Sequence, residues 1–90
     1  MRVARRYLIR GRVQGVGFRY FAQAAASREG VHGWVRNLSD GSVEISAEAE
    51  RDEIDRFEKQ IRRGPPGSRV SEVESTDVTA TGDGSGFHIR

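Results

Sequence analysis

The 90-residue chain contains no cysteine and only two prolines. The lack of cysteine excludes disulfide bonds, thiolate nucleophiles and cysteine-based zinc sites, so packing alone must stabilise the fold. Long apolar runs are also missing: the basic start is followed by only a few apolar residues before Arg10. That stretch is too short for a signal-peptide core or a membrane span. The sequence therefore predicts one soluble, cytoplasmic domain over residues 1–90.

Charge is distributed unevenly along the chain. The net charge of +2 is too small to favour nucleic-acid binding by itself. Residues 1–40 carry eight arginines against two acidic residues, a net charge of +6, whereas residues 41–90 carry seven basic and eleven acidic residues, a net charge of −4. An anionic ligand is therefore expected to bind the first half of the chain.

Hydrophobic periodicity and turn residues predict seven elements. Helices are expected at 18–29 and 49–63, and strands at 3–13, 31–38, 42–47, 69–78 (an edge-type strand) and 87–90. The order strand, helix, strand, strand, helix, strand predicts an α+β, ferredoxin-like βαββαβ sandwich, with two helices on one face of a mostly antiparallel sheet. Trp34 is expected in the core or as a lid over the helix.

A glycine-rich segment, GRVQGVGFR at residues 11–19, joins the first strand to the first helix. Glycines let successive backbone amides converge on a phosphate, and the helix start adds free amides and a positive dipole end. Arg19 falls in the first helical turn, where its guanidinium can contact two phosphoryl oxygens. The expected cradle consists of Gln14, Gly15, Val16, Gly17 and Phe18. Taken alone, the same glycines equally permit a tight turn with Arg19 as a surface charge.

Asn37 ends the second expected strand, beside a hairpin turn at residues 39–41. A carboxamide offers a donor and an acceptor, so it can orient a water molecule toward phosphorus. The alternative is that Asn37 only caps the turn. His32 and His88 lie far apart in the sequence without acidic residues patterned around them as metal ligands, so no metal or cofactor is expected.

The two segments GRVQGVGFR and GWVRNLSDGSVE resemble the signature regions of the acylphosphatase family, and the similarity extends through FEKQIRRGPPGSRVSEVE. This resemblance implies an acylphosphate phosphohydrolase that acts without a metal, a cofactor or a phosphoenzyme. It implies that the amides of residues 14–18 bind phosphate, that Arg19 binds the substrate, and that Asn37 orients the nucleophilic water.

The same resemblance implies the binding partners of the chain. The substrate would be a small acyl phosphate such as acetyl phosphate, carbamoyl phosphate or 1,3-bisphosphoglycerate, and inorganic phosphate would be both product and inhibitor. The expected protein is a monomer that binds neither nucleic acid nor membranes. Ser39 departs from the proline that many members have before the Asp-Gly turn, but it touches no catalytic group.

Two other functions fit parts of the sequence. An RNA-binding domain of similar fold would stack bases on aromatic residues of its central strands, yet residues 42–47 have none and the first strand offers only Tyr7. A regulatory module that binds an acyl phosphate without hydrolysing it would not need Asn37. Since the last strand runs to Arg90, the terminal carboxylate is expected near the loop, where it would restrain Arg19.

Overall fold

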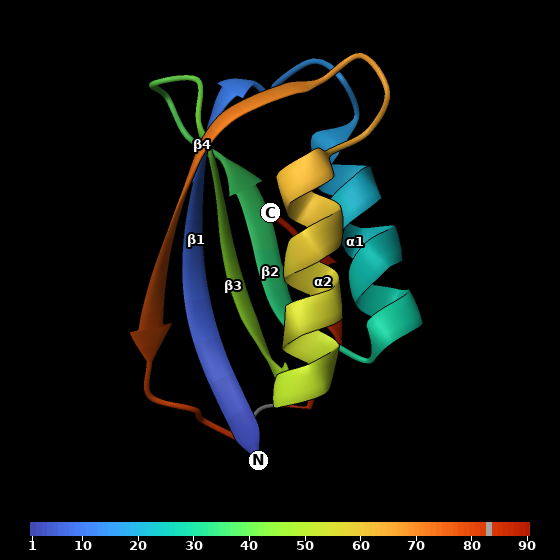
Figure 1. Ribbon diagram of the computed structural model, residues 1–90, viewed down its shortest axis with the longest axis vertical. Coiled ribbons are helices and arrows are strands. Elements are labelled where there is room, and N and C mark those ends of the chain that lie inside the picture. Colours follow the sequence, from blue (N-terminus) through green and yellow to red (C-terminus); the bar gives the residue numbers. More distant parts are fainter. Residues whose placement is uncertain (83) are drawn as a thin grey trace.

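The computed structural model describes residues 1–82 and 84–90. Five strands form one sheet, and two helices cover one of its faces (Figure 1). The elements are, in chain order, β1 (Arg2–Arg12), α1 (Phe18–Glu29), β2 (His32–Asn37), β3 (Val43–Glu50), α2 (Arg51–Arg63), β4 (Arg69–Val78) and β5 (Phe87–Ile89). This arrangement is the predicted ferredoxin-like βαββαβ fold with a fifth strand added.

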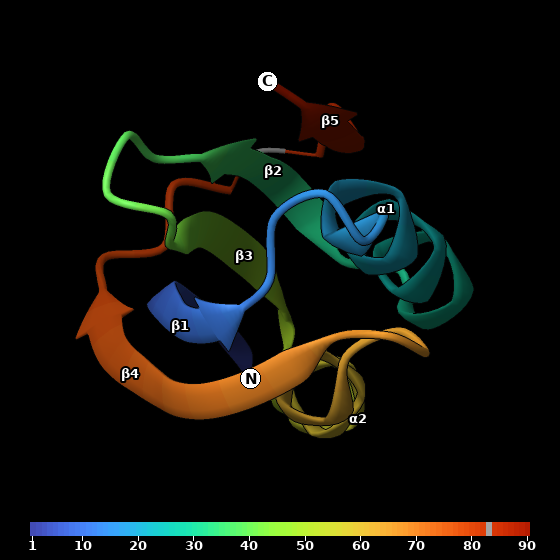
Figure 2. The same cartoon turned by 90° about the horizontal axis from the view of Figure 1, so that it is seen from above.

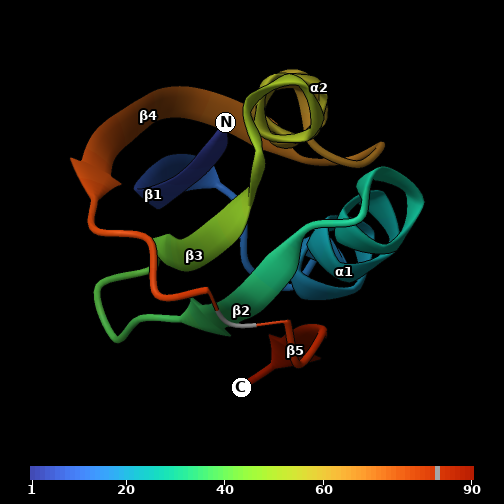
Figure 3. The same cartoon turned by 90° about the horizontal axis from the view of Figure 1, so that it is seen from below.

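The strand order across the sheet is β4-β1-β3-β2-β5. β1, β2, β3 and β4 pair antiparallel with their neighbours, whereas β5 runs parallel to β2, with Phe87 opposite Gly33 and Ile89 opposite Val35. Seen from above and below, β5 lies beside β2 on the same side of the molecule as α1, and β4 curves towards α2 (Figures 2 and 3). The prediction that residues 69–78 form an edge strand is confirmed.

The core lies between the sheet and the two helices. Tyr7 and Ile9 alternate along β1 towards the helices and are fully buried, as alternation in a half-buried strand requires. α2 contributes the apolar stripe of Ile54, Phe57 and Ile61, all fully buried, against a charged outer face. None of the helices in residues 1–82 and 84–90 combines the length and apolar character needed to cross a membrane.

β3 continues to Glu50, so α2 begins at Arg51 and not at residue 49 as the sequence suggests. Ala47 and Ala49 favour helices by intrinsic propensity. Here they are buried and pair with residues of β1, so sheet packing outweighs that propensity.

Trp34 does not lie where the sequence suggested. Its neighbour Val35 is fully buried, and successive side chains of a strand point to opposite faces of the sheet, so Trp34 faces away from the helices. Three guanidinium groups surround its ring at 4.6–5.5 Å from the centroid, those of Arg6, Arg36 and Arg90. The prediction that Trp34 belongs to the core or covers the helix is therefore wrong.

The only aromatic residue that the first strand offers to an RNA-binding function is also turned away from the open sheet face. Tyr7 is fully buried, and its ring centroid lies 6.3 Å from that of Phe57. Its hydroxyl donates a hydrogen bond to Glu58. Base stacking on Tyr7 is therefore excluded.

Glu48 fastens the segment that leads from β4 to β5. Its carboxylate accepts hydrogen bonds from Arg2 Nε at 2.8 Å, from the Thr81 amide at 2.8 Å and from the Gly82 amide at 2.6 Å. Burial on its own would raise the pKa of this carboxyl, but the bonds from Arg2, Thr81 and Gly82 outweigh burial and lower the pKa to about 2. The folded chain thus holds Glu48 in its ionised form.

Candidate active site

The loop between β1 and α1 adopts the backbone that a phosphate cradle requires. Gly15 has φ 73° and Gly17 has φ 77°, both in the left-handed region. Residues with side chains rarely adopt this conformation, so glycine is needed at both positions. A Cβ at either position would meet no protein atom within 4 Å, so the backbone conformation and not crowding requires glycine there.

α1 begins directly after Gly17, and no side chain among the described residues caps its first amides. The first turn contains no acidic residue. Helix starts carry unpaired N–H groups and a partial positive charge, which together favour a bound anion. Arg19 adds a full positive charge in the same turn.

A cavity of about 120 Å³ lies between this loop and the end of β2. Its lining includes six of the seven residues that the sequence singled out, namely Gln14, Gly15, Gly17, Phe18, Arg19 and Asn37. Val13 and Tyr20 complete it. Residues more than twenty positions apart in the sequence therefore meet at one site, although larger cavities exist elsewhere.

Val16 is the one predicted loop residue that does not line the cavity. Its half-buried side chain packs against the hydrophobic core, together with the 2% exposed Phe18. These two apolar side chains anchor the loop and the helix start. A role for Val16 in ligand binding is thereby limited to its main chain.

Asn37 brings an unused acceptor to the cavity. Its Oδ1 atom is buried and has no hydrogen-bond partner in the described part of the chain. The adjacent turn is capped instead by Asp40, whose Oδ1 accepts bonds from the amide and the hydroxyl of Ser42 at 2.9 and 2.5 Å. These two bonds, that of the hydroxyl first, lower the pKa of Asp40. The turn therefore does not use the Asn37 side chain.

Gln14 connects the loop to the turn that follows Asn37. Its Nε2 atom donates to the main-chain oxygens of Leu38 at 2.7 Å and Ser42 at 2.9 Å. The sequence placed Gln14 among the phosphate-binding residues without assigning its side chain a partner. In the structure that side chain fixes the distance between the loop and the hairpin.

Arg19 is held from the opposite side by the end of the chain. Its Nη1 atom donates to the main-chain oxygen of Arg90 at 3.4 Å, which is a long hydrogen bond. The amide of Arg90 in turn donates to Val35 at 2.9 Å, so β2 positions that oxygen. The last residue therefore lies near Arg19, while the expected ion pair with the terminal carboxylate stays a prediction.

Sequence reasoning missed two residues of the cavity, the buried Val13 and the exposed Tyr20. Tyr20 is 69% exposed. The available signal in the sequence was a tyrosine directly after Arg19, in the first turn of a helix rich in alanine. No group of three or more His, Cys, Asp or Glu residues suited to hold a metal ion occurs within residues 1–82 and 84–90.

Comparison with known proteins identifies the family. The model of the acylphosphatase family matches residues 5–89. An acylphosphatase of Koribacter versatilis (strain Ellin345) is 45% identical over 86 residues, which cover 96% of this chain and 78% of that one.

Solved structures give the same result. The crystal structure of acylphosphatase from Bacillus subtilis superposes with a TM-score of 0.94 at 38% identity and covers 98% of each chain. An acylphosphatase from Coxiella burnetii gives a TM-score of 0.93 at 36% identity, covering 99% of this chain and 93% of that one. The chain belongs to the acylphosphatase family and is an enzyme of that family.

Proposed function

We propose that the protein hydrolyses the carboxyl-phosphate bond of acyl phosphates by direct attack of a water molecule, without a metal or other cofactor. The observation that carries this proposal is that Arg19 and Asn37 meet at one cavity beside the start of α1, where the Asn37 Oδ1 atom and the first helix amides have no side-chain partner among the described residues. Residues 1–90 would form the single domain responsible, and inorganic phosphate would bind as product and inhibitor.

The loop amides and Arg19 hold the phosphoryl group in this mechanism. The amides of residues 14–18 and the helix dipole neutralise part of its charge, and the Arg19 guanidinium forms charge-assisted bonds to its oxygens. Phosphoryl transfer depends mainly on positioning and charge stabilisation. Since the bond from Arg19 to Arg90 is long, the guanidinium is steadied without losing its capacity for phosphate.

Asn37 orients the water. Its carboxamide accepts from the water and leaves the water oxygen facing phosphorus. A bond then forms between that oxygen and phosphorus while the bond from phosphorus to the carboxyl oxygen breaks. The electron pair leaves with the carboxylate, and the water proton passes to phosphate or solvent. A carboxylate is a good leaving group, so no general acid is required.

Gln14 contributes by coupling these two parts. One carboxamide bridges the Leu38 and Ser42 oxygens, so the loop that holds phosphate and the strand end that carries Asn37 move as one unit. Near-attack geometry is sensitive to displacements of about 1 Å. Gln14 is therefore a positioning residue as well as a source of one cradle amide.

The decisive experiment measures benzoyl phosphate hydrolysis in the presence of a chelator by the wild type and by Asn37→Ala. The wild type is expected to stay active. Asn37→Ala is expected to lose on the order of a hundredfold in kcat while its affinity for inorganic phosphate stays near the wild-type value, because the contact with water is made mainly in the transition state. A wild type that needs added magnesium would refute the metal-free mechanism. A folded Asn37→Ala variant with most of its turnover would refute the role of Asn37.

A further inference from the structure

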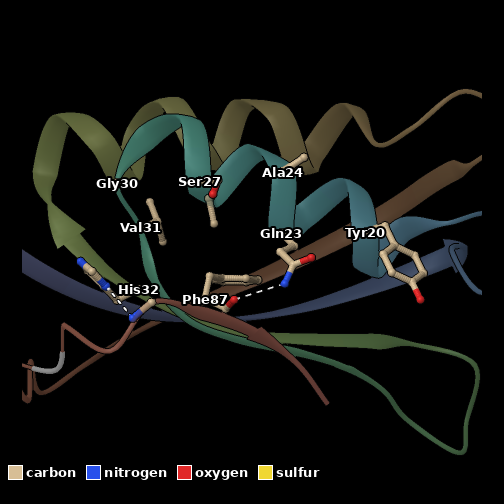
Figure 4. Close-up of a pocket in the computed structure, with 10 residues that line it drawn as sticks. Tyr20, Gln23, Ala24, Ser27, Gly30, Val31, His32 and Phe87 are labelled. Carbon is tan, nitrogen blue, oxygen red and sulfur yellow. Dashed lines mark hydrogen bonds between the residues drawn. The ribbon is translucent and has the colours of Figure 1, made fainter.

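A groove of about 410 Å³ lies between α1 and β5. Tyr20, Gln23 and Ser27 line it from the helix, and Val31, His32 and Phe87 line it from the sheet side (Figure 4). Gln23 Nε2 donates to the Phe87 oxygen at 3.4 Å, and His32 Nδ1 accepts from the Gly86 amide at 3.0 Å. The first bond joins the helix wall to the sheet wall, and the second joins β2 to the residue before β5 within the sheet wall.

The groove adjoins the phosphate cradle. Tyr20 lines both the 120 Å³ cradle and the 410 Å³ groove, so the two cavities share this residue. Tyr20, Gln23 and Ser27 are spaced i, i+3 and i+7, so they share one helix face and mark a path of roughly 10 Å along α1. A ligand anchored in the cradle can therefore extend into the groove past Tyr20.

The direction agrees with the chemistry of an in-line displacement. The leaving group lies opposite the attacking water at phosphorus. Asn37 lines the cradle from the end of β2, whereas Tyr20 lines it from α1. An acyl group directed away from Asn37 thus passes along the helix side.

The lining of the groove specifies an uncharged occupant. Its lining combines the aromatic and aliphatic side chains of Tyr20, Phe87 and Val31 with an amide, a hydroxyl and an imidazole from Gln23, Ser27 and His32. No lysine, arginine, aspartate or glutamate is among the described residues that line it. Small-molecule sites typically combine an apolar lining with a few polar groups in volumes of about 300–1,000 Å³. A second anionic group on the substrate would find no counter-charge here.

We infer that this groove is an acyl-group subsite, and that Tyr20 selects substrates whose acyl group is uncharged and larger than acetyl, such as aryl or extended aliphatic groups. This inference rests on the proposed function. The ring of Tyr20 packs against the part of the acyl group nearest the phosphate, and the groove takes the remainder.

The test compares binding of two phosphonates that cannot be hydrolysed, (2-oxo-2-phenylethyl)phosphonate and (2-oxopropyl)phosphonate, by isothermal titration calorimetry. The wild type is expected to bind the phenyl analogue roughly three- to tenfold more tightly, as an aromatic contact allows. Tyr20→Ala should abolish this preference, and Tyr20→Phe should keep it. Ser27→Trp should also abolish it, because helical side chains tilt toward the N-terminus and the indole would fill the groove.

Lys59→Trp, which adds the same bulk to an exposed position of α2, is the matched control and should keep the preference. Equal affinity of the wild type for both analogues would overturn the subsite, as would an unchanged ratio in both Tyr20→Ala and Ser27→Trp. Hydrolysis is assayed separately with benzoyl and acetyl phosphate. If neither substrate is hydrolysed but the wild type still prefers the phenyl phosphonate, the proposed function is refuted and the groove remains supported as a binding subsite. If both are hydrolysed without an affinity ratio, only the subsite fails.

Discussion

The two helices of this protein begin in opposite ways. α2 starts with a capping box in which the Glu50 carboxylate accepts from the Glu53 amide and the Glu53 carboxylate accepts from the Glu50 amide, with Asp52 adding further negative charge. α1 starts after Gly17 with no side-chain cap among the described residues and with Arg19 in its first turn. Both helices have amides that need partners. α2 satisfies part of this need with carboxylates, whereas α1 has no side-chain cap among the described residues, in line with the proposed binding of an anion.

The surroundings of Glu48 show how hydrogen-bond donors of this kind stabilise a negative charge. The Glu48 carboxylate accepts hydrogen bonds from two main-chain amides, the Arg2 guanidinium and the Thr81 hydroxyl, a donor set similar to that of the proposed cradle but with a hydroxyl added. The pKa of this carboxyl falls to about 2. The comparison indicates that main-chain amides, one arginine and one hydroxyl together favour a negative charge in this fold.

The largest effect is expected from removing Arg19, the positively charged residue in the first turn of α1. Arg19→Ala should lower kcat/KM roughly thousandfold, because it removes a charge contact that strengthens in the transition state. Inhibition by phosphate should weaken by roughly ten- to a hundredfold. Arg19→Lys should recover only part of this, since an ammonium cannot form the bidentate contact. Kinetics with benzoyl phosphate test the change, and undiminished phosphate inhibition would show that the amides suffice alone.

The buried Glu48 carboxylate provides the next test. Glu48→Gln should lower the free energy of unfolding by roughly 2 kcal/mol at pH 7 through the loss of charge-assisted bonds. A lowered pKa in the folded state stabilises the protein above the ordinary glutamate value of 4.5, and this contribution is lost as the pH falls towards about 2. The Tm difference between the wild type and Glu48→Gln should therefore shrink over this interval. A difference that does not vary with pH would contradict this explanation.

A smaller effect is expected from the bridge between the loop and the hairpin. Gln14→Ala should lower kcat about tenfold by loosening the placement of Asn37 relative to phosphate. If Gln14 acts through Asn37, its substitution should cost much less in an Asn37→Ala background. Gln60→Ala, which removes carboxamide bonds to Glu29 and Arg56, serves as the control. Equal losses in both backgrounds would show that Gln14 acts independently of Asn37.

The smallest effect is expected from making α1 resemble α2. Tyr20→Glu introduces a carboxylate at the position that Glu53 occupies in α2, three residues after the cap. The added negative charge competes with phosphate for the same amides, so phosphate affinity should fall about fivefold, whereas Tyr20→Gln should have less effect. The reciprocal change Glu53→Gln should lower Tm by a few degrees and leave phosphate affinity unaltered. If Tyr20→Glu and Tyr20→Gln bound phosphate with equal affinity, the electrostatic field at the start of α1 would not contribute to phosphate binding.

Local signals explain which parts of the fold could be predicted. The bounds of α1 and β4 agree with the sequence prediction. α1 ends where Gly30 adopts the left-handed conformation at φ 73°, and β4 follows the break at Gly64-Pro65-Pro66-Gly67. Such glycine and proline signals act within a few residues of the chain. The face of Trp34 and the parallel position of β5 depend on distant strands, so the local pattern did not reveal them.

The candidate site also has features that the local sequence predicted and features that depend on distant residues. Residue types predicted the loop, Arg19 and Asn37, because phosphate chemistry restricts which groups are useful. The partners of the Gln14 side chain, at Leu38 and Ser42, lie 24 and 28 residues away and became visible only in the fold. Tyr20 was missed for a related reason: its exposure and its place beside the groove are properties of the packed helix.

The central position of the first strand has a consequence for how the chain reaches its native state. β1 lies between β3 and β4, so it cannot complete its pairing until residues 69–78 have arrived. Chains dominated by such distant pairings fold slowly, in milliseconds to seconds, because loops must close before contacts form. The cradle needs residues 14–19, Asn37 and Arg90 together. After dilution from denaturant, recovery of phosphate binding should therefore lag behind recovery of helical circular dichroism and mark the last step of folding.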